Sequence, residues 1–134
     1  MTAPVLMDTN ALMMPVELDV RLFDELQRLL DTFEPVAPAP VVEELRQLQD
    51  SGGEEGIAAS VGHDLANERC MIVDAEAPYA DDAVVELANA GTADYVVTND
   101  KPLQDRVLDA GVPVISLRGS NTLAITEPCT NGSQ

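Results

Sequence analysis

The stretch Pro4-Val5-Leu6-Met7-Asp8-Thr9-Asn10 decides how the rest of the chain is interpreted. A short apolar run is followed at once by three polar residues that favour turns, and this change predicts a buried strand that runs into a loop. Asp8 therefore stands at the end of a buried strand. In a parallel α/β sheet, ligands bind outside the carboxyl ends of the strands, so this position is informative.

Strands and helices alternate along the remaining sequence. We expect a first helix that begins with Asp19 as its N-cap and ends near Phe33, and then only a very short strand, because Pro35 and Pro38 remove backbone donors. The other expected helices span residues 41–49, 54–68, 78–90 and about 100–108, and the other expected strands span 71–73, 95–98 and 112–117. This alternation predicts a three-layer α/β sandwich with a central, mainly parallel sheet. We expect one domain over residues 1–119 and a partly frayed C-terminal tail over 120–134.

The charge balance excludes one class of function. The chain has 24 Asp and Glu against 7 Lys and Arg, a formal net charge of -17, and 46% of its residues are hydrophobic. The chain should therefore fold, with acids spread over its surface. Such a surface is typical of a halophilic archaeal cytoplasm, and a basic partner that faces the acids is the alternative. Proteins that bind duplexes through basic patches rely on Lys and Arg, so this kind of binding is excluded.

Cysteine use and hydropathy bear on the compartment. Cys70 and Cys129 are the only thiols, and Cys129 lies in the polar tail, so we expect no structural disulfide. No apolar run approaches the roughly 20 residues that span a bilayer, and no basic segment followed by an apolar core opens the chain. We therefore expect a cytoplasmic protein that does not contact membranes.

Several acids occupy the expected strand ends and helix starts, where they would meet along one edge of the sheet. They are Asp8, Glu43, Glu44, Asp81, Asp82 and Asp100. A purely local role is the alternative for each of them, since Asp in turns and at helix N-caps accepts backbone hydrogen bonds, and an acid in a first turn complements the helix dipole. A local role does not account for the apolar segments that adjoin Asp8, Asp82 and Asp100.

Converging carboxylates repel one another unless a cation or protons intervene. Mg²⁺ prefers oxygen ligands, and one or two such ions can polarise a phosphodiester and supply a water nucleophile without any His or Cys. The sequence offers only one histidine, His63, which we interpret as a surface or packing residue of the Ala-rich helix. Metal-dependent phosphodiester hydrolysis is therefore the chemistry that this set of residues favours.

Four segments in order carry a resemblance to a known family. They are Val5-Leu6-Met7-Asp8-Thr9-Asn10, Val41-Val42-Glu43-Glu44-Leu45, Ala80-Asp81-Asp82-Ala83-Val84-Val85 and Val96-Val97-Thr98-Asn99-Asp100. Together they resemble the PIN-domain nucleases over residues 4–118. Within that superfamily, the closing stretch Pro113 to Gly119 is most similar to archaeal single-domain relatives of the small-subunit rRNA-processing enzymes, often labelled VapC-like.

The resemblance implies a set of site residues. The family's metal-binding acids fall on Asp8, Glu44, Asp82 and Asp100, with Glu44 preferred to Glu43 because it stands directly before Leu45, and Asp82 preferred to Asp81 because it directly precedes the small apolar run. Behind these acids, the polar residues expected to orient the site are Asn10, Thr98 and Asp81. The candidates for phosphate contacts are Lys101, Arg106 and Arg118, although Arg106 at helical spacing is equally interpreted as a solvated cation.

The resemblance also implies an activity and partners. The activity is hydrolysis of single-stranded RNA with Mg²⁺ or Mn²⁺, in rRNA processing or as a toxin-type RNase. The partners are a second copy of the chain and either a small antitoxin protein or a pre-ribosomal particle. A non-catalytic RNA-binding or ribosome-assembly module with the same fold is the alternative. A phosphoacceptor receiver domain fits less well, because Asp8-Thr9-Asn10 lacks the acidic pair that a receiver carries after its first strand.

Overall fold

A mixed sheet forms the centre of the protein in the computed structural model, which describes residues 2–128. Its strands are β1 (Ala3–Met7), β2 (Phe33–Pro38), β3 (Met71–Val73), β4 (Tyr95–Val97), β5 (Val114–Arg118) and β6 (Thr122–Thr126). In the sheet they follow the order β3-β2-β1-β4-β5-β6. Every neighbouring pair is parallel except β5 and β6, which pair antiparallel. The predicted α/β fold with a mainly parallel sheet is confirmed.

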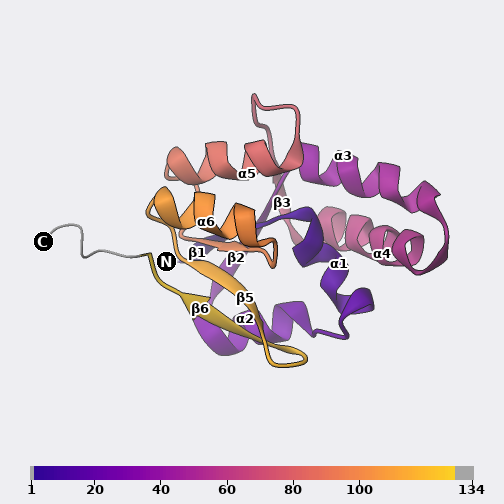
Figure 1. Cartoon of the computed structure of the whole chain (residues 1–134), viewed down its shortest axis with the longest axis horizontal. Coiled ribbons are helices and arrows are strands. Elements are labelled where there is room, and N and C mark those ends of the chain that lie inside the picture. Colours follow the sequence, from indigo (N-terminus) through magenta and orange to yellow (C-terminus); the bar gives the residue numbers. More distant parts are fainter. Residues whose placement is uncertain (1, 129–134) are drawn as a thin grey trace, which may run out of the picture.

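Helices cover both faces of this sheet. They are α1 (Thr9–Glu17), α2 (Leu22–Leu30), α3 (Ala39–Leu48), α4 (Gly53–Arg69), α5 (Ala80–Asn89) and α6 (Lys101–Asp109), with one 3₁₀ turn, η1 (Gln49–Ser51). Figure 1 shows α5 and α6 side by side on one face of the sheet and α2 on the opposite face. No helix within residues 2–128 combines the length and the apolar character needed to cross a bilayer.

The order of the strands creates a switch point between β1 and β4. From β1 the chain proceeds outward through β2 to β3, whereas from β4 it proceeds in the opposite direction to β5. The two neighbouring central strands therefore lead into helices on opposite sides of the sheet. In open α/β sheets, the crevice at such a point is where ligands bind. Asp8 follows β1 and Asp100 follows β4, so both stand at this crevice.

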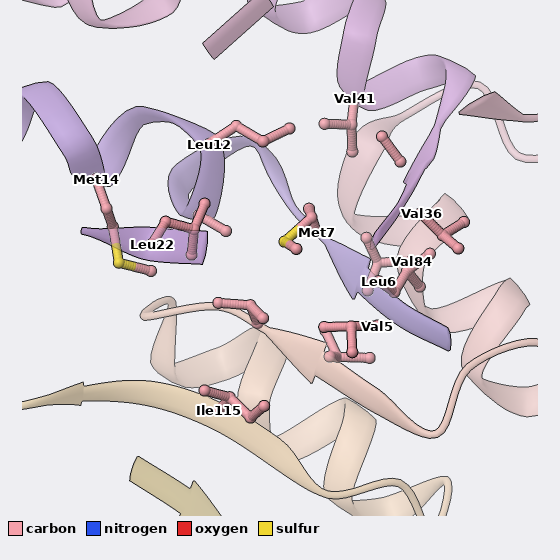
Figure 2. Packing of buried hydrophobic residues seen from close by; sticks show 14 of the residues in the cluster. Val5, Leu6, Met7, Leu12, Met14, Leu22, Val36, Val41, Val84 and Ile115 are labelled. Carbon is pink, nitrogen blue, oxygen red and sulfur yellow. The ribbon is translucent and has the colours of Figure 1, made fainter. Parts of the chain in front are cut away.

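The hydrophobic core is built around β1. Val5, Leu6 and Met7 are fully buried, because helices cover both faces of the strand. Figure 2 shows Leu6 clustered with Val36 of β2 and Val84 of α5. A strand buried on both faces is apolar without alternation, which is the pattern of the Pro4 to Met7 run. The core thus fixes the position of Asp8, the next residue along the chain.

The chain between β1 and β2 differs from the prediction. The polar residues after Met7 do not form an extended loop, because α1 begins at Thr9, directly after Asp8. Asp19 is not a helix N-cap: it lies between α1 and α2 with φ 56°, and Arg21 precedes α2. The helix expected over residues 19–33 is present as the shorter α2, Leu22–Leu30, whereas its predicted N-cap is wrong and α1 before it was not predicted.

Two predicted limits of strands also need correction. The strand expected over residues 35–38 spans the six residues Phe33–Pro38, because it pairs with β1 from Phe33 onward and with β3 from Val36 onward. The sheet also continues past the expected domain end at residue 119, since Thr122–Thr126 pair with β5 as β6. Residues 129–134 of the expected tail, including Cys129, lie outside the described residues.

The closest approach of two helices places α4 against α1. The buried positions of α4 are small residues, namely Gly56, Ala58, Ala59, Gly62 and Ala66. A Cβ atom added at Gly62 would lie 2.8 Å from the carbonyl oxygen of Leu12 in α1. That oxygen belongs to a backbone, which has little room to move. A glycine at position 62 therefore allows this helix contact.

We predict that Gly62→Ala destabilises the fold. The added methyl group forces α4 away from α1, and overpacking of this kind costs about 1–3 kcal/mol, which outweighs the gain of about 1 kcal/mol in helix propensity. Urea unfolding followed by circular dichroism measures the difference. Ser60→Ala, at an exposed position of the same helix, is the matched control and should leave the free energy of unfolding within about 0.5 kcal/mol of wild type. A Gly62→Ala protein as stable as wild type would contradict this account of the contact.

Candidate functional site

A pocket of about 290 Å³ lies at the switch point between β1 and β4. Carboxylates from several elements line it, together with four other residues. The lining residues are Asp8, Thr9, Asn10, Met13, Glu17, Glu44, Leu48, Glu55, Asp81 and Asp100. We call this the acidic pocket. Within the described chain, no Lys, Arg or His is among these residues, so the pocket concentrates negative charge.

Asp8 is the buried member of the acidic pocket, with a residue exposure of 2%. Its Oδ1 accepts a hydrogen bond of 2.6 Å from the backbone N–H of Ala11, which caps α1. Its own N–H donates to the carbonyl of Val97, which ties the end of β1 to β4. The carboxylate is therefore fixed by backbone contacts on both sides.

Burial sets the electrostatics of Asp8. The pKa of its carboxyl group is raised from 3.8 to about 7, chiefly by loss of solvent and, to a lesser extent, by the charges of Asp81 and Asp100. Hydrogen bonds from the Thr98 hydroxyl and the Ala11 N–H lower the pKa, but they do not offset the burial. A negative charge is thus costly at this position unless a cation lies nearby.

Asp100 occupies the equivalent position after β4. It caps α6, and its Oδ1 accepts from the N–H of Leu103 at 3.4 Å. The N–H of Asp100 donates to the buried Thr98 Oγ1 at 3.0 Å, and Gln104 Nε2 donates to the Thr98 carbonyl at 2.9 Å. Thr98 thus contacts both Asp8 and Asp100.

Asn99 also holds this loop, which sequence reasoning missed. Its Oδ1 accepts a hydrogen bond of 2.8 Å from the N–H of Leu117 in β5. The partner lies 18 residues away on another strand, so no local pattern reveals the contact. The loop after β4 is consequently joined to β5 as well as to β4.

Glu44 reaches the acidic pocket from α3. Its Oε1 accepts a hydrogen bond of 2.5 Å from the hydroxyl of Thr9. The adjacent Glu43 is not among the lining residues, and its carboxylate instead accepts hydrogen bonds from Arg46 and Gln47 on the same helix. The structure therefore brings Glu44, the preferred residue of the pair, to Asp8 and leaves Glu43 outside.

Asp81 and Asp82 occupy different positions relative to the acidic pocket. Asp81 lines the acidic pocket, whereas Asp82 is absent from it and accepts a hydrogen bond of 3.0 Å from Arg106 Nη2 in α6. Burial raises the pKa of Asp81, and the charges of Asp100 and then Glu44 raise it further. Consecutive helical residues point in directions about 100° apart, so only one member of this pair can face the pocket.

Of the remaining predicted residues, only one lines the acidic pocket. Asn10 lines it, whereas none of the proposed phosphate-contact residues does. Lys101 is exposed at the start of α6, Arg106 is engaged with Asp82, and Arg118 is exposed at the end of β5. The structure thus does not bring the three cations together around the acids.

Sequence reasoning missed three polar lining residues, Thr9, Glu17 and Glu55. Thr9 stands beside Asp8, and its hydroxyl could have been noticed as a short polar group next to a candidate ligand. Glu17 ends α1 and Glu55 lies in the first turn of α4. Their approach to the pocket depends on how α1 and α4 pack, and no pattern in the sequence predicts that packing.

The residues of the acidic pocket can be tested against a divalent metal ion. Within residues 2–128, no three His, Cys, Asp or Glu side chains lie close enough together to form a ready-made metal site. The available donors are nonetheless all oxygen atoms, which Mg²⁺ and Mn²⁺ favour, and Mg²⁺ is usually held by only one or two carboxylates besides water and phosphate. The oxygen donors of the acidic pocket therefore fit such an ion. Their carboxylates line one cavity but do not converge on a single point.

Comparisons with known proteins agree with the fold. A family model described as a PIN like domain matches residues 5–120. The chain is 34% identical over 116 residues to ribonuclease VapC4 of Methanocaldococcus jannaschii, an alignment that covers 83% of this chain and 87% of that protein. The chain therefore belongs to the PIN-like domain family.

Two solved structures are similar to this fold. The PIN domain endonuclease Utp24 matches with a TM-score of 0.76 and 26% sequence identity, over 92% of this chain and 91% of that one. A domain of a functionally unknown protein from Methanocaldococcus jannaschii matches with a TM-score of 0.63 over 90% of this chain and 94% of that one. At 17% identity, the second similarity concerns the fold alone.

We predict that Asp8→Asn stabilises the protein in the absence of divalent metal. The raised pKa means that the folded state holds a proton that the unfolded state releases above pH 3.8, so Asp8 destabilises the fold increasingly as the pH rises from about 4 to about 7. Asn caps helices as well as Asp does. Thermal unfolding in EDTA at pH 8 should show a Tm at least about 3 °C higher for the variant, and the difference should shrink at pH 5.

Asp94→Asn provides the control for this comparison, because it removes the same formal charge at an exposed position. Its effect on Tm should be small at both pH values. A lower Tm for Asp8→Asn than for wild type at pH 8 would show that the buried carboxylate contributes stability, contrary to this interpretation.

Proposed function

We propose that the protein is a Mg²⁺- or Mn²⁺-dependent endoribonuclease that hydrolyses single-stranded RNA at the acidic pocket. The observation that carries the proposal is the buried Asp8 in one pocket with Glu44, Asp81 and Asp100 at the switch point of the sheet. Asp81 replaces Asp82 in the proposed set of metal ligands, because only Asp81 lines the pocket.

Asp8, Glu44, Asp81 and Asp100 are the residues that would hold the ion. A bound divalent ion supplies Lewis-acid activation of water and neutralises charge on the phosphate. The chain's own contribution is to hold the oxygen donors in place. The N–H of Ala11 and the hydroxyl of Thr98 orient Asp8, and the hydroxyl of Thr9 orients Glu44. Partners of this kind commonly fix the ligands of metal sites.

The proposal that RNA is the substrate rests on similarity to known proteins. The relative with 34% identity is named a ribonuclease, and the similar structure Utp24 is named an endonuclease. The absence of basic residues from the lining of the acidic pocket, within the described chain, supports binding of the phosphate through the metal. Lys101 and Arg118 remain the nearest proposed contacts for phosphates beyond the cleavage site, and Arg106 is already engaged with Asp82.

The cellular setting is likewise a proposal that rests on similarity to the family. The resemblance supports a cytoplasmic homodimer that works as a toxin controlled by a small antitoxin, or as a processing nuclease on a pre-ribosomal particle. The acidic surface suits a halophilic archaeon, where high salt screens repulsion among the acids. The non-catalytic RNA-binding module remains the alternative function.

We predict that Asp81→Asn abolishes cleavage whereas Asp82→Asn retains it. Loss of a metal ligand should lower the rate by more than the roughly 10- to 100-fold typical of the partners that support ligands. Loss of the exposed pair between Asp82 and Arg106 should change the rate by less than about threefold, because such pairs contribute little. Cleavage of a labelled single-stranded RNA with Mn²⁺, resolved on a denaturing gel, measures both rates.

The two variants control for one another, since they differ by one position in the same helical turn. Equal loss of activity in both, or a larger loss for Asp82→Asn, would contradict the assignment of Asp81. If the folded wild-type protein binds the RNA but leaves it uncut with either metal, the non-catalytic alternative replaces the nuclease.

A further inference from the structure

A second pocket of about 320 Å³ adjoins the acidic pocket. Glu44 and Asp81 line both pockets, so these two carboxylates stand between them. On its other side, the second pocket is bounded by the rings of Pro40, Pro78 and Tyr79. It therefore offers flat, largely apolar surfaces directly beside the proposed metal ligands.

Tyr79 is the most exposed of the large hydrophobic side chains in the described chain, at 73%. Its position in the sequence is two residues before Asp81, and it is the N-cap residue of α5. An aromatic ring that is left in water beside a site full of carboxylates has no role in the core. The structure thus keeps an exposed aromatic side chain in the pocket that adjoins the acidic pocket.

The backbone that carries Tyr79 is held in place. The Tyr79 carbonyl accepts a hydrogen bond of 2.9 Å from the N–H of Ala83, which begins the helix. The carboxylate of Glu86 accepts hydrogen bonds from the backbone N–H groups of Glu76 and Ala77, at 2.8 to 3.1 Å. The loop before α5 is therefore pinned to α5 itself, and the Tyr79 backbone keeps a constant position relative to Asp81.

We propose that Tyr79 is the stacking platform for a nucleobase of the RNA strand, adjacent to the phosphate that is cleaved. This inference rests on the proposed function. Both pockets are lined by acids and, in the part of the chain that the structure describes, by no Lys or Arg, so no basic side chain of the lining holds the strand at this point. Stacking on an aromatic ring needs no charge and accepts any base, and it is a common means of binding single strands.

The test measures binding separately from cleavage. Fluorescence anisotropy of a labelled, mixed-sequence single-stranded RNA, with Ca²⁺ in place of Mg²⁺ and the RNA checked for integrity on a gel, gives Kd for each variant. Tyr79→Ala should raise Kd at least about fivefold, the lower end of the effect of losing one stacked base. Tyr79→Phe keeps the ring and should stay within about twofold of wild type. Met71→Ala, at an exposed apolar residue of β3, is the control for loss of exposed apolar surface.

An RNA with a single abasic nucleotide, scanned through the sequence, locates the stacked base. At one position next to the cleavage site, the abasic RNA should weaken binding by the wild type but not by Tyr79→Ala.

If Tyr79→Ala binds every RNA as tightly as wild type while the wild type still cleaves, the stacking role is overturned and the nuclease stands. If Tyr79→Ala changes only the oligomeric state in gel filtration, the ring belongs to a protein interface and the inference is also overturned. If the wild type neither binds nor cleaves RNA, the proposed function fails together with it.

Discussion

The structure depends on one constraint, the position of the Asp8 carboxylate at the junction of β1, β4 and α1. Core packing buries β1 completely, and the hydrogen bond from Ala11 to Asp8 starts α1 directly at the strand's end. The N–H of Asp8 also joins β1 to β4, where the order of the strands reverses. A charged group is therefore held without solvent at the point where an α/β sheet offers its binding crevice. Burial of this carboxylate destabilises the folded state, and a bound cation at the same position would offset that loss.

The net charge of -17 has two components in the structure. Six of the 24 acids line one pocket, and four of them, Asp8, Glu44, Asp81 and Asp100, hold the ion in the proposed function. The other acids lie outside that pocket and include three that form ion pairs with arginine: Glu25 with Arg28, Glu43 with Arg46, and Asp82 with Arg106. The acidity therefore excludes binding through basic patches, while it is compatible with binding through a metal ion and through aromatic stacking.

Sequence patterns predicted the strand ends well, because a buried strand followed by a polar residue has few interpretations. Asp8, Glu44, Thr98 and Asp100 could be placed at one edge of the sheet from this rule and from the family resemblance. The sequence does not determine which of Asp81 and Asp82 lines the acidic pocket, because this depends on where α5 packs against α6. The contributions of Glu17 and Glu55 were likewise invisible, since they follow from the contact between α1 and α4.

The central claim is that the carboxylates at the switch point form a divalent metal site. Crystals grown with Mn²⁺, with diffraction data collected near the manganese absorption edge, test it most directly. The account predicts an anomalous peak within the acidic pocket, bounded by Asp8, Asp81 and Asp100, that disappears in crystals of the Asp8→Asn variant. A peak at Asp82 or elsewhere on the surface, with none in the acidic pocket at saturating Mn²⁺, would contradict it.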